Sequence, residues 1–169
     1  MRTTNNQKLK IKSRKTWDEY FIEILHATQE RATCDRGRAA AIIIKDHHVL
    51  TTGYVGSPIG VDHCDEVGHE FIESYEKDKK GKIVLRKHCV RTVHAEQNAI
   101  AQAARFGISI NGAKIYCTMF PCYVCAKILI NVGIKEVIAE YSYQSALPSK
   151  RIFHAAGVKF NILYDRPLY

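Results

Sequence analysis

Two short motifs limit the fold of this chain more than any other feature, because their side chains suit one metal ion and must therefore meet. The first is His94-Ala95-Glu96 and the second is Pro121-Cys122-Tyr123-Val124-Cys125. Each stands where the sequence predicts the start of a helix, over residues 94–106 and 121–132. A lone His-x-Glu or a lone Cys-x-x-Cys is weak evidence, whereas the two together are much more specific. The fold must therefore bring two helix starts together.

The order of the other expected elements favours an α/β fold with helices on both faces of a mixed sheet. Apolar residues at helical spacing predict a helix from Trp17 to about Arg31, with Thr16 as its N-cap. Apolar runs at 39–44 and 49–54 predict two strands joined by a hairpin turn. The expected elements that follow are strands at 114–118, 135–139 and 158–163 and a short helix at 150–156.

The length of 169 residues fits a single domain with one core. Residues 1–16 are polar and basic and are predicted to form a disordered arm, and residues 17–169 to form the domain. The stretch at about 55–90 is rich in turn residues and is predicted to be an insertion with a purpose of its own. No apolar run reaches the roughly 20 residues of a membrane helix, and residues 1–16 do not resemble a secretory signal. A cytoplasmic protein without a membrane partner is expected.

The formal net charge of +8 is concentrated in two segments, residues 8–15 and 77–87. Such runs can attract phosphate-bearing partners, but more often they are a flexible tail and a solvated hairpin. Neither run interleaves aromatic side chains as a single-strand binding surface would. We therefore do not expect nucleic acid as a partner.

The two motifs predict a catalytic zinc site. His94, Cys122 and Cys125 supply imidazole and thiolate ligands and leave a fourth tetrahedral position open for water. Zinc lowers the pKa of such a water toward neutrality. Glu96 lies close by in the sequence without being a ligand, and it is expected to carry protons as the general acid and base.

The combined pattern is the signature of zinc deaminases that act on nucleobases, and the chain resembles the deoxycytidylate deaminase family, including the late-competence proteins of bacteria. The resemblance covers about residues 17–163. The residues that carry it are Trp17-Asp18-Glu19-Tyr20-Phe21, Ala32-Thr33-Cys34-Asp35-Arg36, Gly53-Tyr54, the run from His88 to Ile100, Phe120-Pro121-Cys122, Cys125-Ala126-Lys127 and Gly133-Ile134-Lys135.

The resemblance implies a cytidine-deaminase-like three-layer α/β/α sandwich with a five-stranded mixed sheet. It also implies the reaction dCMP + H2O to dUMP + NH3, which supplies a thymidylate precursor. Further expectations from the family are a homo-oligomer, either hexamer or dimer, and regulation by dCTP and dTTP, with Mg2+ on the regulatory nucleotide.

The sequence departs from the family at two places. Gly53-Tyr54-Val55-Gly56 stands where Gly-Tyr-Asn-Gly is usual, and Ala39-Ala40-Ala41 stands where Val-Gly-Ala is usual. Valine cannot make the hydrogen bond that the asparagine makes to the nucleotide, a loss of about 1–3 kcal/mol. Three alternatives therefore stay open: another cytosine nucleotide, a nucleic acid as for tRNA adenosine deaminases, or a nucleotide-sensing protein with weak catalysis.

Three further cysteines suggest a second metal site, and some members of the family hold a structural zinc in this region. Cys34, Cys64 and Cys89 flank the insertion, and His69 completes our candidate ligand set. The alternative is that these are ordinary thiols. Cys117 lies in an expected strand and is predicted to be a buried apolar residue.

The substrate contacts are predicted from the motifs and their surroundings. Phe120 is expected to form a wall of the base pocket, with Ala95 and Val55 beside it. The substrate phosphate is expected to meet one or more of four residues, which are Gly56, Ser57, Arg36 and Arg91. Tyr143 is expected to serve in packing.

Overall fold

A five-stranded mixed sheet forms the centre of the computed structural model, which describes residues 13–77, 81–143 and 146–167. The first three neighbours in the sheet pair antiparallel and the last three pair parallel. The mixed sheet confirms the predicted fold class. In spatial order the strands are β2 (His48–Tyr54), β1 (Ala40–Lys45), β5 (Lys114–Met119), β6 (Glu136–Ser142) and β7 (Lys159–Pro167).

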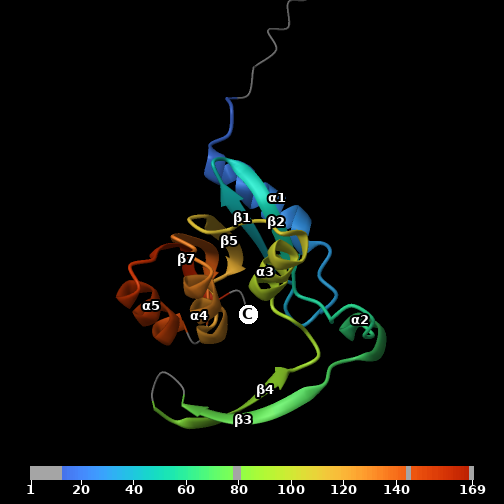
Figure 1. Cartoon of the computed structure of the whole chain (residues 1–169). Coiled ribbons are helices and arrows are strands. Elements are labelled where there is room, and N and C mark those ends of the chain that lie inside the picture. Colours follow the sequence, from blue (N-terminus) through green and yellow to red (C-terminus); the bar gives the residue numbers. More distant parts are fainter. Residues whose placement is uncertain (1–12, 78–80, 144–145, 168–169) are drawn as a thin grey trace, which may run out of the picture.

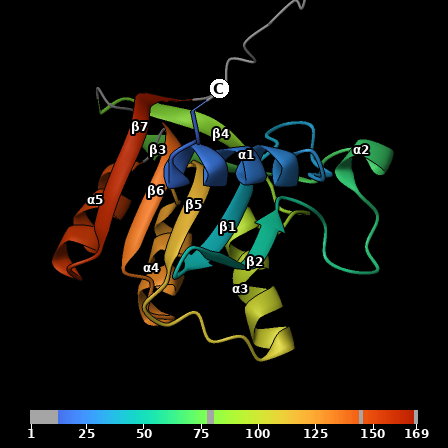
Figure 2. The ribbon, with the colours of Figure 1, turned by 90° about the horizontal axis from the view of Figure 1, so that it is seen from above.

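Helices cover both faces of this sheet, as Figures 1 and 2 show. One face carries α1 (Trp17–Gln29), and the other carries α3 (Ala95–Phe106), α4 (Tyr123–Asn131) and α5 (Ala146–Ala155). The arrangement is the predicted three-layer sandwich.

Alternating side chains of β1 explain why both faces need cover. Ile42 and Ile44 pack with Phe21 and Leu25 of α1, while Ile43 packs in the larger cluster beneath α3, α4 and α5. All five are at most 1% exposed. A strand buried on both sides is apolar throughout, which is why the sequence of β1 reads as one continuous apolar run.

The start of α1 is fixed by its cap, as predicted. The Thr16 hydroxyl accepts a hydrogen bond from the backbone N–H of Glu19, and the Glu19 carboxylate accepts one from the backbone N–H of Thr16 at 2.7 Å. This reciprocal pair is a capping box. The helix is also tied to the sheet, because the Tyr116 hydroxyl donates to Asp18 Oδ1 at 2.6 Å.

A glycine in β2 lets the strand approach α3 very closely. A Cβ on Gly53 would lie 2.2 Å from the carbonyl oxygen of Ala95 and 2.4 Å from the backbone nitrogen of Ala99. Only a residue without a side chain fits between this strand and the first turn of α3. That turn carries Glu96, so the packing at Gly53 helps to position it.

The insertion contains more regular structure than its turn-rich sequence predicts. It forms the short helix α2 (Cys64–Val67) and a two-stranded antiparallel hairpin, β3 (Phe71–Lys77) and β4 (Ile83–Cys89). Figure 1 shows this hairpin as a separate ribbon that runs from α2 to below α5. The β-branched and aromatic residues Phe71, Ile72 and Tyr75, followed by the apolar run 83–85, were the signal for it.

Elsewhere the boundaries differ from the predicted ones by a few residues. The largest differences are at α5, which begins at Ala146 instead of residue 150, and at β7, which ends at Pro167 instead of residue 163. Pro148 falls within the first turn of this helix, where a missing backbone N–H costs nothing. The predicted arm falls largely on residues 1–12, and part of the second basic segment on residues 78–80, all outside the described residues. In the part of the chain that the structure describes, no helix is long and apolar enough to cross a membrane.

Candidate active site

The two motifs occupy the N-terminal ends of neighbouring helices. His94 is the N-cap of α3, and its backbone N–H donates to Gln97 Oε1 at 3.2 Å. Cys122 is the N-cap of α4, and its sulfur accepts a hydrogen bond from the backbone N–H of Cys125 at 3.5 Å. Both caps have extended backbone angles, so each motif turns sharply from the preceding segment into its helix. The prediction that both motifs open helices is therefore confirmed.

Pairing outside the helices brings the motifs to one place. Val93, directly before His94, exchanges backbone hydrogen bonds with Gly56 at 2.9 and 3.3 Å, beyond the end of β2. Phe120, directly after β5, donates its backbone N–H to the carbonyl oxygen of Tyr141 in β6 at 2.8 Å. Both motifs therefore start from positions held by the sheet.

The donor atoms of the two motifs form a compact triangle. His94 Nδ1 lies 3.6 Å from Cys122 Sγ and 3.5 Å from Cys125 Sγ. Zinc bonds of about 2.0–2.1 Å to nitrogen and 2.3 Å to sulfur put these atoms about 3.6 Å apart around a tetrahedral centre. The donor types and their separations therefore fit zinc, with one coordination position left for a non-protein ligand.

Protons in this triangle are shared between the three donors. A hydrogen bond from Cys125 lowers the pKa of Cys122 to about 4, with a further contribution from His94. The same Cys122–Cys125 contact raises the pKa of Cys125, and the hydrogen bond to Cys122 raises the pKa of His94 to about 9. A metal ion would take the place of the shared protons, so metal binding there would release protons.

Glu96 is buried beside this triangle, with 8% of its surface exposed. Burial raises the pKa of its carboxyl group, and the neighbouring His94 opposes that rise only in part. A carboxyl group with a raised pKa can both accept and return a proton near neutral pH. The side chain on which the sequence analysis placed the proton transfers thus has a suitable environment.

A cavity of about 470 Å³ opens onto His94, Glu96 and Cys122. Four of the predicted substrate contacts line this cavity, which are Phe120, Ala95, Val55 and Arg36. Phe120 is 1% exposed and packs edge-on against Phe153, with ring centroids 5.7 Å apart, so its ring is held rigidly.

Three other predicted contacts are not among the residues that line this cavity. Gly56 is engaged through its backbone with Val93, and the buried hydroxyl of Ser57 has no hydrogen-bond partner among the described residues. Arg91 Nη2 lies 3.9 Å from Glu70 Oε2. Their contact with a phosphate stays a prediction.

The sequence analysis missed one whole wall of the cavity. Consecutive residues of β4 line it, and Tyr143, which was expected only to pack, lines it too. The available signal was the basic composition of the second charged segment, which was interpreted as a solvated hairpin. The residues that β4 contributes are Leu85, Arg86, Lys87, His88 and Cys89.

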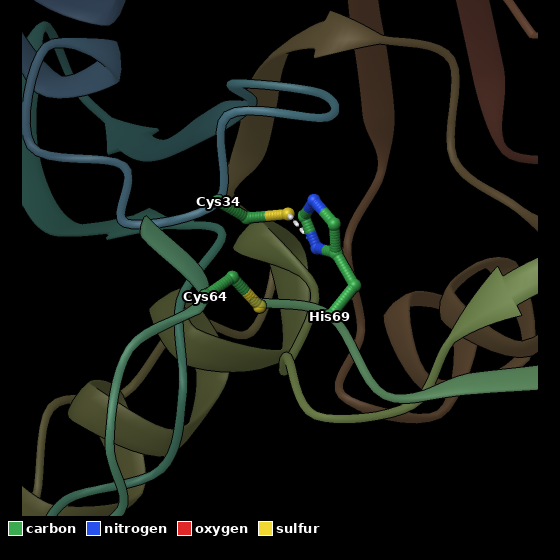
Figure 3. A group of neighbouring side chains, drawn as sticks. All are labelled: Cys34, Cys64 and His69. Carbon is green, nitrogen blue, oxygen red and sulfur yellow. Dashed lines mark hydrogen bonds between the residues drawn. The ribbon is translucent and has the colours of Figure 1, made fainter. Parts of the chain in front are cut away.

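A second group of sulfur and nitrogen donors lies at the base of the insertion. Cys34, Cys64 and His69 have donor atoms within 4.8 Å of one another, and Figure 3 shows the three side chains pointing toward a common centre. Cys34 Sγ is 3.9 Å from His69 Nδ1, and Cys64 Sγ is 3.7 Å from Cys89 Sγ. The four candidate ligands of the predicted second site thus lie together.

The surroundings of this second group resemble those of a metal site. The other ring nitrogen of His69, Nε2, lies 3.1 Å from Asp35 Oδ1. A carboxylate on the far nitrogen commonly orients a histidine ligand. Burial raises the pKa of Cys64 to about 12. Burial would also raise the pKa of Cys89, but hydrogen bonds from the backbone of Arg91 and Glu70 and from the side chains of His69 and Cys64 lower it to about 7. The sixth cysteine, Cys117, is buried in the main core, as predicted.

A His-Cys-Cys triangle on two helix N-termini, with a buried glutamate beside it and a three-layer fold behind it, defines the class of zinc-dependent nucleobase deaminases. The model of the family described as the cytidine and deoxycytidylate deaminase zinc-binding region matches residues 15–141. The chain belongs to this family.

Individual relatives agree with that assignment. The chain is 36% identical over 143 residues to ComE operon protein 2 of Bacillus subtilis, covering 85% of this chain and 69% of that one. It is 33% identical over 146 residues to the deoxycytidylate deaminase of Schizosaccharomyces pombe, covering 86% of this chain but only 44% of that one. The dCMP deaminase of cyanophage S-TIM5, solved with dCMP and dUMP, shares the fold with a TM-score of 0.68 at 23% identity, over 89% of this chain and 99% of that one.

Proposed function

We propose that this protein deaminates dCMP hydrolytically to dUMP and ammonia. The observation that carries the proposal is the triangle of His94, Cys122 and Cys125 beside the buried Glu96. His94, Cys122 and Glu96 line one cavity large enough for a nucleotide. The names of several relatives support dCMP as the substrate, since those proteins are deoxycytidylate deaminases.

His94, Cys122 and Cys125 would hold the zinc ion. When bound there, zinc supplies Lewis-acid activation of water, which makes a nucleophile available near neutral pH. Cys122 and Cys125 contribute negative charge, and the backbone N–H groups at the start of α4 help to keep that charge stable.

Glu96 moves the protons of the reaction. Its carboxylate accepts a proton from the attacking water as the new bond from oxygen to ring C4 forms, and it delivers that proton to ring N3. It then passes the second proton of the water to the departing amine, so that the C4–N bond breaks and ammonia leaves. The raised pKa of Glu96 suits both halves of this cycle.

Apolar side chains shape the space for the base. Phe120 and Ala95 are buried at 1% and 2% exposure, and Val55 at 8%, and all three line the cavity. They exclude water and hold a planar ring by contact. Because Val55 cannot hydrogen-bond, recognition of the nucleotide relies on other groups than in relatives with asparagine at this position.

Cys34, Cys64, His69 and Cys89 would hold a second, structural zinc. A closed set of four protein ligands is the usual composition of structural sites. The loops that carry these residues have little apolar core of their own, which is the situation in which a metal contributes most to folding.

Assembly, regulation and location complete the proposal. We expect a homo-oligomer that responds to dCTP and dTTP, supported by the family resemblance and by exposed apolar side chains on the hairpin, such as Tyr75 at 79% exposure. A cytoplasmic location is supported by cysteines that gather as free thiols in metal-type clusters.

The direct test is ammonia release by zinc-loaded protein from dCMP, dCTP, deoxycytidine and CMP. We expect turnover to be fastest with dCMP and to be lost in the Glu96→Ala variant. Deletion of residues 1–12 serves as a second control, because a polynucleotide deaminase would lose salt-sensitive affinity and a mononucleotide enzyme would not. Absence of turnover with all four compounds would contradict the proposal.

A further inference from the structure

We infer that Arg86, on strand β4 of the insertion hairpin, binds the 5′-phosphate of the substrate together with Arg36. The inference rests on the proposed function, since it assigns the phosphate contact of the same site. It makes the hairpin, which lies outside the five-stranded sheet, the part of the molecule that selects a nucleotide over a nucleoside.

The charged side chains that line the cavity come from different parts of the fold. Glu96 lies in the first turn of α3, whereas Arg86 and Lys87 lie on β4 and Arg36 lies in the loop before β1. The base must be presented to Glu96, since the reaction takes place at the ring of the base. The sugar and phosphate then extend away from Glu96, toward cationic residues of the other elements.

Two cations near the cavity already have a carboxylate partner. Lys87 Nζ lies 3.2 Å from Glu73 Oε1, its cross-strand neighbour in the hairpin, and Arg91 Nη2 lies 3.9 Å from Glu70 Oε2. These ion pairs satisfy part of the charge of Lys87 and Arg91 without any ligand.

Arg86 and Arg36 differ from those residues. Among the residues that the structure describes, neither forms an ion pair with a carboxylate, and the cross-strand neighbour of Arg86 is Ser74, which has no charge. Two guanidinium groups without acidic partners at one cavity form a site of positive charge. Guanidinium groups bind phosphate oxygens in a bidentate way that lysine cannot copy.

The structure also holds both arginines at the same cavity. The guanidinium group of Arg36 lies 5.0 Å above the ring of Phe71, the first residue of β3. Phe71 is paired in register with Cys89, the last residue of β4. Arg36 is thus docked on the base of the same hairpin that carries Arg86.

The test compares dCMP with deoxycytidine, because the two substrates differ only in the phosphate. For Arg86→Met we expect kcat/KM with dCMP to fall about 10- to 100-fold, mainly through KM, since one charge-assisted contact is lost. With deoxycytidine, kcat/KM should stay within about twofold of the wild-type value. Arg86→Lys should give an intermediate loss with dCMP, because it keeps the charge but not the planar fork.

Lys82→Met is the matched control. Lys82 lies directly before β4 of the same hairpin but is not among the residues that line the cavity, so this variant removes the same charge from the same region. We expect it to leave the ratio between the two substrates unchanged. An equal loss of activity with dCMP and deoxycytidine in Arg86→Met would show a structural role and overturn the inference, as would an unchanged kcat/KM with dCMP.

A binding measurement separates this inference from the proposed function. Calorimetry on zinc-loaded protein with dUMP and with deoxyuridine measures phosphate recognition without turnover. If the wild-type protein deaminates nothing yet binds dUMP in a way that needs Arg86, the proposed function fails and the inference holds. If it deaminates dCMP while Arg86→Met binds dUMP as tightly as the wild type, the inference alone fails.

Discussion

The two cysteine–histidine clusters of this molecule are built from similar donors but in opposite structural settings. The donors of the catalytic cluster, His94, Cys122 and Cys125, sit on helix caps above a closely packed core. The donors of the insertion cluster, Cys34, Cys64, His69 and Cys89, come from loops, a four-residue helix and the end of a hairpin. Ala99 and Leu129, in the helices behind the catalytic cluster, are 0% exposed, whereas Phe71 and Ile72 beside the insertion cluster are 46% and 56% exposed.

The difference indicates whether the folded chain positions the metal ligands or the metal holds the chain in place. Packing of α3 and α4 on the sheet fixes the catalytic donors before any metal arrives, as a site with an open coordination position requires. At the insertion cluster the buried apolar side chains around Cys34 and Cys64 are the small ones of Ala32 and Val55, so metal ligation would add to a small core in holding the loops together. At the catalytic cluster the fold positions the metal ligands. At the insertion cluster the metal would help to position the loops that carry its ligands.

The sharpest test of the catalytic cluster is Glu96→Gln. The change keeps the size of the side chain but removes its ability to carry a proton, so we expect kcat with dCMP to fall by about 10²- to 10⁴-fold. Zinc content should be unchanged, because Glu96 is not among the three donors. Metal analysis together with steady-state kinetics measures both quantities, and loss of zinc in this variant would mean that Glu96 belongs to the ligand set.

The corresponding test of the insertion cluster is Cys64→Ser. We expect zinc content to fall by about one ion per chain. The hairpin should then become sensitive to limited proteolysis, while turnover of deoxycytidine is largely kept because the catalytic cluster does not depend on these loops. Cys117→Ala is the matched control, since Cys117 is a buried cysteine outside both clusters. An unchanged zinc content in Cys64→Ser would show that the insertion cluster does not hold a zinc ion through Cys64.

Packing behind the catalytic cluster can be tested at Gly53. An alanine there would meet the backbone of Ala95 and Ala99, which cannot move without shifting the first turn of α3. We expect Gly53→Ala to destabilise the protein by about 1–3 kcal/mol through overpacking, and to lower kcat because Glu96 moves with the turn. Thermal unfolding would show this as a decrease of several degrees, since 1 kcal/mol corresponds to about 2–4 °C for a chain of this length. An unchanged melting temperature would show that β2 does not hold α3.

The smallest expected effect concerns the stability of the metal-free protein. Burial raises the pKa of Glu96 in the folded state, so its contribution to stability is fully present below the pKa of an exposed glutamate and is lost as the pH rises through the folded-state pKa. Glu96→Gln does not titrate. We therefore expect its melting temperature in chelator to exceed that of the wild type by a few degrees at pH 7–8, with the difference shrinking toward pH 4. A difference that does not vary with pH would contradict this account.

The sequence predicted the fold most accurately where periodicity was strong. The buried strand β1 and the helices α1 and α3 were placed within about two residues, because their apolar positions follow one clear period and their ends carry capping signals. The basic end of the insertion was interpreted as a solvated hairpin, but the bounds of β3 and β4 were not predicted, since the glycines and lysines of the insertion suggested turns.

The candidate site was predicted in part for a similar reason. His94, Glu96, Cys122 and Cys125 lie together because their motifs are local and each opens a helix. Arg86 was missed because its place at the cavity depends on where the hairpin docks, which no local pattern encodes. Gly56 and Ser57 were predicted to meet the substrate phosphate, but within residues 55–57 only Val55 lines the cavity, because the chain turns away to pair with Val93.

The hairpin formed by β3 and β4 has a consequence for how this protein family can diversify. It shares no strand pairing with the five-stranded sheet, yet its residues form a wall of the cavity. The three donors and Glu96 lie at the starts of α3 and α4, so we expect that a hairpin of different length or charge would change the cavity wall and leave these four residues in place. New substrates can thus be acquired by exchanging a peripheral module, and the hairpin is the natural place to graft such changes by engineering.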